Sequence, residues 1–445
     1  MKGKFNTKFG VIAATVGSAV GLGNIWRFPY EAGVHGGGAF LLINIIFVLL
    51  LGIPVICAEF IIGRHSGANV WEAFDSFRNG RRWKIIGAMG LLAATLILGF
   101  YSVVAGWTAQ YIIQSVDGFS GLTTPEALHN QFVSFSSDGW LPLLWTLIFL
   151  TINYFVLIRG VEKGIEKMSN ILMPVLFVIL LAFTVNSLCL EKAGEGLAFL
   201  FKPDFSEITP SVVLGALGQA FFSLSLGLGC LITYAGYFKS DTPLLRTATV
   251  SAMLDTLVAI MAGMIIFPAV FTFGQEPAAG PQLVFEVLPS IFSNMPWGSF
   301  WATLFFVLLF VASLTSTISL FETLVAFLSG RGQMSRFKAV NITMGIVICL
   351  ATLCSLSFGP LADLKIFTLN VFNFSDYVSS NILLPLGGML CSIFVGWFVD
   401  RRIIRSELCG DSPSRFKRVA VKTVTFSLRY IAPVGIGLVF IFGIL

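Results

Sequence analysis

The stretch AVGLGNIWRFPYE, residues 19–31, lies within the first long apolar segment of the chain. It carries two glycines, an asparagine, an arginine, a proline and a glutamate, which a continuous membrane helix would not favour. Where a helix unwinds inside a membrane, its freed amide and carbonyl groups must find other partners. We therefore expect a break in this helix, at which something other than the helix itself satisfies the backbone.

The composition of the chain is typical of a membrane protein. Of its 445 residues, 56% are hydrophobic and only 11% are charged, whereas a soluble domain averages about 25% charged residues. Apolar segments of roughly 20 residues can cross a bilayer. The sequence contains eleven, near residues 10–31, 39–62, 86–114, 140–158, 168–188, 211–237, 247–273, 297–328, 338–356, 372–398 and 424–445. We therefore predict an all-α polytopic membrane protein.

The distribution of Lys and Arg predicts the orientation, because basic residues stay on the cytoplasmic side of short loops. With the N-terminus inside, 24 of the 28 basic residues are cytoplasmic, Arg27 lies within a span, and three fall outside: Lys192, Lys202 and Lys365. We therefore expect a cell-membrane protein with a cytoplasmic N-terminus and an extracytoplasmic C-terminus.

Several classes of function are disfavoured. The basic run from Arg401 to Arg418 is explained by a cytoplasmic loop beside anionic lipid, so nucleic acid is not an expected partner. The seven cysteines show no CxxC spacing and are interpreted as buried thiols. The three histidines, His35, His65 and His129, have no metal-binding spacing, so the sequence gives no support to an enzyme.

A weak internal repeat links the first and sixth segments, since SAVGLGN at 18–24 is echoed by SLSLGLG at 223–229. An offset of five spans means that the second copy crosses in the opposite sense, which is typical of transporters with inverted repeats and broken helices. The repeats would cover about 9–188 and 211–398 of a single domain, 1–445, with a peripheral helix at about 424–445. Alternatively, Gly17 and Gly21 form a GxxxG packing motif.

The residues near these breaks suit a cation and a carboxylate. Carbonyl oxygens, amides and hydroxyls are hard ligands for an alkali ion, and free amides at the start of a half-helix favour a carboxylate. Thr315, Ser316 and Ser319 lie on one face of the eighth span, although such hydroxyls also bond back to their own helix. Asp255 is a functional candidate because an ionisable group within a span is costly.

Four blocks of sequence resemble the neurotransmitter:sodium symporter family. They are VGSAVGLGNIWRFPYEAGVHGGGAF, GQAFFSLSLGLGCLITYAGY, ASLTSTISL and SNILLPLGG, in this order along the chain. The resemblance implies five helices plus five inverted helices, with helices 1 and 6 unwound and an eleventh helix at the periphery. It also implies a bacterial, amino-acid-carrying sodium symporter that works by alternating access.

The resemblance implies two sodium sites and no requirement for chloride. The first would use Ala19, Asn24, Ser223 and Asp255, and the second Gly17, Val20, Ala312, Thr315 and Ser316. The family often has Asn where this chain has Asp255. Because the carboxylate of Asp255 could supply the negative charge that chloride provides in other members, we expect transport without chloride.

The substrate site would bind an amino acid by its carboxylate and its side chain. Gly21 stands where amine-carrying members have Asp, so the substrate is expected to bring its own carboxylate. The resemblance places it against Ala19, Leu22, Gly23, Ile97, Tyr101, Phe222, Ser223, Ser225, Leu228, Ser316, Ser319 and Leu320. This lining is mostly apolar, which favours an aromatic or large aliphatic side chain. The alternatives are another small zwitterion, an amine, or an ion channel.

The resemblance also implies two gates. Arg27 and Asp376 would form the outer gate pair, with Gln219 nearby. At the inner gate, Lys2 and Phe5 replace the usual Arg and Trp, and Gly330 stands where Asp is common, so Glu322 is a possible substitute. Membrane lipid is the other expected partner, and no obligate protein partner is predicted.

Overall fold

The computed structural model describes residues 4–78, 80–119, 125–274, 283–330, 334–409 and 414–444. Within these ranges the regular secondary structure is helical apart from one small antiparallel hairpin, in which β1 (Lys365–Ile366) pairs with β2 (Leu369–Asn370). The expected all-α architecture is confirmed. The hairpin was not predicted, since it is only two residues long on each side.

Eight helices of the described residues are long and apolar enough to cross a membrane. Five of them consist of consecutive helical pieces, and three are single helices. The eight are α3–η2–α4 (Gly38–Ser66), η4–α5 (Gly80–Val116), η5–α8 (Val161–Leu188), α12 (Leu244–Thr272), α14 (Gly298–Leu328), α15 (Arg336–Leu356), α16–η9–α17–η10 (Val371–Phe398) and α19–η11–α20, apolar over Lys417–Phe442. The chain is therefore a multi-pass membrane protein.

Two further helix pairs pass the same test of length and composition together, but each pair is sharply bent. α1 (Lys8–Ala19) and η1–α2 (Gly23–Val34) meet at 54°, and α6 (Pro125–Ser137) meets α7 (Leu141–Leu157) at 71°. The predicted span 211–237 is divided into α10 (Pro210–Ser223) and α11 (Cys230–Gly236). The breaks expected in spans one and six are thus present. The total of eleven crossings stays a prediction.

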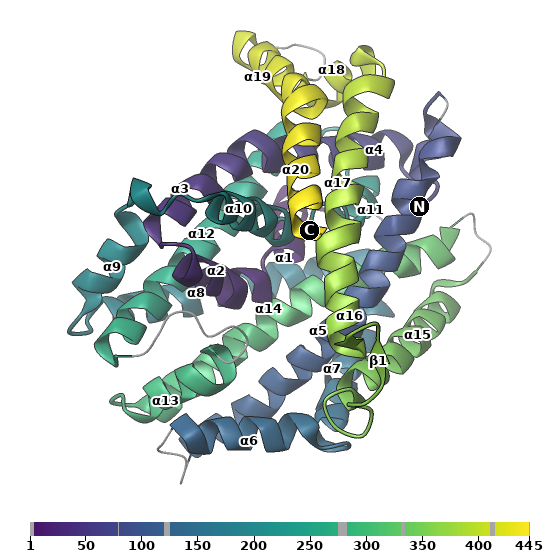
Figure 1. The fold of residues 1–445 in the computed structure, drawn as a ribbon. Helices are drawn as coiled ribbons and strands as arrows, with labels where there is room; N and C mark the ends of the chain where they lie inside the picture. The colour runs from purple at the N-terminus through teal and green to yellow at the C-terminus, as the bar shows by residue number, and fades with distance from the viewer. Residues whose placement is uncertain are drawn as a thin grey trace.

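Short helices occupy the connections between the spans. They are η3 (Ala73–Ser76), α9 (Ala193–Phe201), η6 (Phe205–Glu207), η7 (Leu283–Val287), α13 (Leu288–Ser293) and α18 (Arg401–Cys409). In Figure 1, α6 and α13 lie at the bottom of the molecule and α18 and α19 at the top. Loops predicted for opposite sides of the membrane are therefore at opposite ends.

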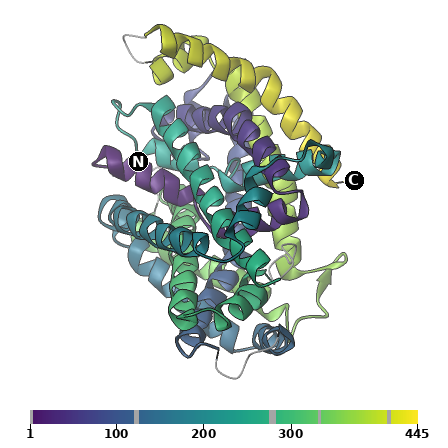
Figure 2. The ribbon, with the colours of Figure 1, turned by 90° about the vertical axis from the view of Figure 1, so that its left-hand side faces the viewer.

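α14 forms the centre of the bundle, and the C-terminal helices form its edge. The share of buried residues differs between the spans. In the most apolar 18 residues of α14, 83% are buried inside the protein, whereas in the C-terminal span only 29% are. Figure 2 shows the C-terminal helices running along the outside. The helix begins at Arg415 and not near 424, because the Ser414 hydroxyl caps it by accepting from the Lys417 amide at 3.3 Å.

Candidate functional site

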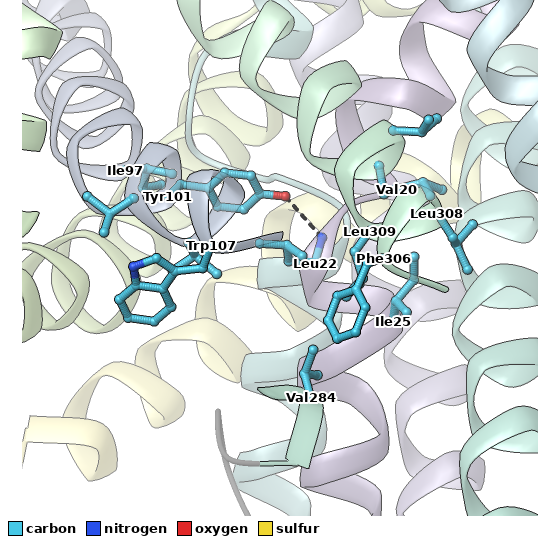
Figure 3. Close-up of a cluster of buried hydrophobic side chains, with 14 of the residues drawn as sticks. Val20, Leu22, Ile25, Ile97, Tyr101, Trp107, Val284, Phe306, Leu308 and Leu309 are labelled. Carbon is cyan, nitrogen blue, oxygen red and sulfur yellow. Dashed lines mark hydrogen bonds between the residues drawn. The ribbon is translucent and has the colours of Figure 1, made fainter. Parts of the chain in front are cut away.

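The first break frees backbone groups that side chains from distant spans then satisfy. α1 ends at Ala19, and Val20 is extended with φ −68° and ψ 115°. Ser316 of α14 donates to the Val20 carbonyl at 3.0 Å. The Leu22 amide donates to the hydroxyl of Tyr101 on α5 at 3.0 Å, as Figure 3 shows. The break is therefore a meeting point of three spans.

The second break is shaped by residues with positive φ. Ser225, Gly227 and Gly229 have φ of 54°, 82° and 74°. Ser225 donates to the Ser18 carbonyl at 3.1 Å, which joins this break to the first one. The Gly227 amide donates at 2.8 Å to the carboxylate of Glu59, a fully buried residue of α4.

Glu59 was missed in the sequence, although an acidic residue inside an apolar span is a visible signal. Its partner could not be found from sequence, because Gly227 is 168 residues away along the chain. The contact supports the break itself and does not reach the cavity described below, whose lining does not include Glu59.

Three side chains of the first predicted sodium site meet in one buried cluster. Asn24 donates to Asp255 Oδ1 at 2.7 Å and to Ser223 Oγ at 2.9 Å, and Ser223 donates to Asp255 Oδ2 at 2.6 Å. Ala19, the fourth predicted ligand, ends α1 beside them and lines the cavity. The amide oxygen of Asn24 accepts from the Gly21 amide at 3.0 Å, which leaves one of its two lone pairs for an ion.

The five residues of the second predicted sodium site also come together, between α1 and α14. Ser316 Oγ lies 3.0 Å from the Val20 carbonyl and 3.5 Å from that of Gly17. Thr315 lies against Gly17, where an added Cβ would be 3.3 Å from Thr315 Cβ, and its hydroxyl donates to Ala312 at 3.0 Å. Thr315 thus bonds to its own helix, whereas Ser316 reaches across to the break.

A small cavity lies between the two breaks. Ten of the twelve predicted substrate-binding residues line it: Ala19, Gly23, Ile97, Tyr101, Phe222, Ser223, Ser225, Leu228, Ser316 and Leu320. Of the other two, Leu22 lines a second, neighbouring pocket, and Ser319 accepts at 2.9 Å from Ser18, which itself lines the cavity. Leu384 also lines the cavity. It was missed, although it belongs to the SNILLPLGG block.

Gly21 lies where no side chain fits. A Cβ at this position would be 2.6 Å from Ser316 Oγ and 2.7 Å from the Tyr101 hydroxyl. These two hydroxyls hold the Val20 carbonyl and the Leu22 amide in place. Glycine at this position therefore allows the hydroxyls of Ser316 and Tyr101 to approach the backbone closely, and it also leaves room for a ligand.

The second pocket, which also contains Leu22, is lined by the predicted outer gate residues Arg27 and Asp376. They do not form the expected pair in this structure. Arg27 lies over the Phe222 ring, 4.4 Å from its centre, and its Nε is 3.5 Å from Glu31 Oε1. Asp376 instead accepts from Ser380 at 2.9 Å.

The reason for the difference is local, because Glu31 is one helical turn beyond Arg27 and reaches it without any movement of the spans. Gln219, the third predicted gate residue, donates to the Gly23 carbonyl at 3.0 Å. Its side chain is therefore bonded to the backbone of the first break.

The opposite end of the bundle is closed by a buried ion pair. Glu322 of α14 is fully buried and accepts from Arg336 of α15 at 2.6 and 3.1 Å. The hydroxyl of Tyr237, at the end of α11, donates to the same carboxylate at 2.5 Å. Arg336 also donates to the Leu157 carbonyl at 2.9 Å. Half of span six is thus tied to three other helices.

The other predicted inner gate residues lie around this pair. Phe5 packs edge-on against Tyr234 and Tyr237. Gly330 lies next to the side chains of Asn69 and Glu72, and Lys2 is outside the described residues. Glu322 is paired here with Arg336, and its part in an inner gate stays a prediction. Arg336 was missed because a basic residue in a short loop is explained by topology alone.

Comparisons with known proteins agree with this geometry. The profile of the family described as "Sodium:neurotransmitter symporter family" matches residues 2–124 and 127–444. The chain belongs to the sodium:neurotransmitter symporter family. An uncharacterized sodium-dependent transporter of Bacillus subtilis, YhdH, is 39% identical over 98% of this chain and 96% of its own length.

More distant and structural relatives support the same assignment. The bovine sodium-dependent dopamine transporter is 25% identical over 95% of this chain and 67% of its own length. The crystal structure of the transporter MhsT in complex with L-phenylalanine matches 99% of both chains, with a TM-score of 0.90 and 42% identity. This chain is accordingly a sodium-dependent transporter of the same fold.

For this member of the symporter family we expect Gly21→Ala to weaken sodium-dependent binding of a labelled amino acid at least tenfold. The added methyl would displace the hydroxyls of Ser316 and Tyr101, and overpacking typically costs about 1–3 kcal/mol. Gly345→Ala is the matched control, because a Cβ at Gly345 has no neighbour within 4 Å. Equal affinities of the two variants in a scintillation proximity assay would show that the close approach is unimportant.

We also expect Arg336→Gln to lower the melting temperature, since it leaves a buried carboxylate unpaired and breaking such a pair costs about 3–5 kcal/mol. The double variant E322Q/R336Q should recover part of the loss, because no charge is then left buried. Arg405→Gln removes an exposed arginine of α18 and serves as the control. A melting curve of R336Q that overlays the wild-type curve would contradict the role assigned to the ion pair.

Proposed function

We propose that this protein is a sodium-coupled symporter of large hydrophobic L-amino acids. The cavity between the two helix breaks carries the proposal. Much of the cavity lining is apolar and would surround the side chain of the substrate: Ile97, Phe222, Leu228, Leu320 and Leu384. The complex of the related MhsT with L-phenylalanine supports a ligand of this class.

The carboxylate of the substrate would bind at the first break. The amides of Leu22 and Gly23 lie at the start of the outer half-helix, and such helix starts attract anions. The Leu22 amide and the Tyr101 hydroxyl, now 3.0 Å apart and bonded to each other, would each bond to the carboxylate. Gly21 provides no anionic group for an amine, so a carrier of amines or of another zwitterion is the less favoured alternative.

Two sodium ions would bind beside the substrate. The first would be held by Ala19, Asn24, Ser223 and Asp255, next to the carboxylate, and the second by Gly17, Val20, Ala312, Thr315 and Ser316. Because the first ion and the carboxylate would attract each other, each raises the affinity of the other. This mutual effect is the physical basis of the proposed coupling.

Alternating access would follow from the arrangement of the gates. Residues of about 9–188 and 211–398 would form two inverted repeats, and the half-helices α2 and α11 would move with the gates. The outer gate would close when Arg27 reaches Asp376, and the inner gate would open when Glu322 separates from Arg336. The N-terminus would be cytoplasmic and the C-terminus extracytoplasmic in the cell membrane, with no obligate protein partner.

We expect proteoliposomes containing the protein to accumulate L-phenylalanine only under an inward sodium gradient. Replacement of external sodium by potassium should abolish uptake, because the related proteins are sodium-dependent transporters. An excess of leucine or tryptophan should compete, whereas glycine or dopamine should not. Uptake driven equally well by potassium, or inhibited more strongly by dopamine than by tryptophan, would contradict the proposal.

Transport should not require chloride, because Asp255 already places a carboxylate in the cluster with Asn24 and Ser223. Asp255→Asn removes this charge and should make the remaining uptake dependent on chloride or abolish it. The measurement is uptake in chloride and in gluconate buffers at equal sodium concentration. Wild-type uptake that falls several-fold in gluconate would show that Asp255 does not replace the anion.

A further inference from the structure

The outer half-helix α2 (Phe28–Val34) and its two ends carry three charged or titratable residues on one face. Arg27, Glu31 and His35 are spaced four residues apart and therefore follow one another along the helix. Glu31 lies between the other two: one carboxylate oxygen is 3.5 Å from Arg27 Nε and the other is 3.3 Å from His35 Nδ1. Any change in the charge of His35 therefore acts on Glu31, the ion-pair partner of Arg27.

His35 is held by both neighbouring elements. Its ring stacks on Phe40 of α3, with the ring centres 5.7 Å apart and the planes at 14°. Its Nε2 is 3.4 Å from Ser211 Oγ on α10, and a Cβ at Gly215 of α10 would lie 2.9 Å from the ring. The imidazole is therefore fixed between the outer halves of spans one and six, which together form the site.

Few charged groups surround the imidazole. On its own element these are Glu31 and Arg27. From the segment after α9, the side chain of Glu207 lies beside Gly36 and the backbone of Lys202 beside Gly38, while α3 and α10 contribute Phe40 and Ser211. The hydrogen bond with the Glu31 side chain raises the pKa of His35 above its ordinary value, although burial opposes it; the Glu31 backbone carbonyl, 2.9 Å from His35 Nδ1, raises it further. His35 thus gains a proton below this raised pKa and loses it as the pH rises through it.

We propose that Glu31 and His35 are positioning residues of the outer gate. Glu31 holds Arg27 over the Phe222 ring, away from Asp376, and proton binding at His35 draws the Glu31 carboxylate away from Arg27. Arg27 is then free to reach Asp376 and close the pocket over a bound substrate. The inference rests on the proposed function, since it assigns a pH dependence to the closure of that same site.

The proposal fixes the direction in which substrate affinity changes with pH. At acidic external pH, closure should be easier and the apparent affinity for substrate higher. The gain should disappear as the pH rises through the raised pKa of His35. Because partly exposed ion pairs are weak, the expected change in dissociation constant is about two- to fivefold.

The three histidines of the chain offer a matched set of variants. Each lies beside a glutamate: His35 by Glu31, His65 by Glu407 at 3.6 Å, and His129 by Glu286 at 2.9 Å. The experiment measures the dissociation constant of labelled L-phenylalanine at saturating sodium, between about pH 5.5 and 8.5. It uses purified wild type and the variants H35Q, H65Q and H129Q.

We expect wild type, H65Q and H129Q to bind more tightly at the acidic end, and H35Q to show a flat profile. If H35Q does not fold, Glu31→Gln provides the same test, because it releases Arg27 at every pH and should give a flat profile at the tighter affinity. A pH dependence retained in H35Q or E31Q, or absent from the wild type, would overturn the inference. Loss of sodium-dependent binding by the wild type at every pH would instead count against the proposed function.

Discussion

The structure depends on one constraint, which is that a backbone interrupted inside a membrane must find new partners. Two spans are interrupted, and the partners come from other spans: Tyr101 from α5, Ser316 from α14 and Glu59 from α4. Each of these contacts brings a further helix to the break. The binding cavity lies at the breaks because they are the points at which several helices present polar groups to one another.

The same constraint links the site to its gates. Gln219 bonds to the Gly23 carbonyl, four residues before Arg27, so the outer gate begins where the first break ends. At the other end of the bundle, the half-helix α11 is tied through Tyr237 to Glu322 and Arg336. Because η1–α2 and α11 each connect one end of a break to a predicted gate residue, the proposed movement of a gate would change the geometry of the site.

Residues close to a recognisable motif could be predicted from the sequence, and residues defined by long-range contacts could not. The glycine-rich stretches predicted both breaks, and ten cavity residues followed from the resemblance to the family, eight of them within the quoted blocks and two, Ile97 and Tyr101, outside them. Glu59 and Arg336 were missed because their roles depend on packing between distant spans. Leu384 was missed although it lies in a quoted block, because the block does not show which of its residues faces the cavity. The Arg27–Glu31 contact was also missed, since the resemblance directed attention to Asp376 and away from the neighbouring turn.

The central claim is that sodium and substrate share the first break, so their binding must be mutually dependent. Linkage requires that sodium raise the affinity for L-phenylalanine by the same factor by which L-phenylalanine raises the affinity for sodium. Isothermal titration of each ligand, with and without a saturating concentration of the other, measures both factors. The account predicts equal factors well above one. A factor of one would contradict it, because the ion and the carboxylate would then not be neighbours.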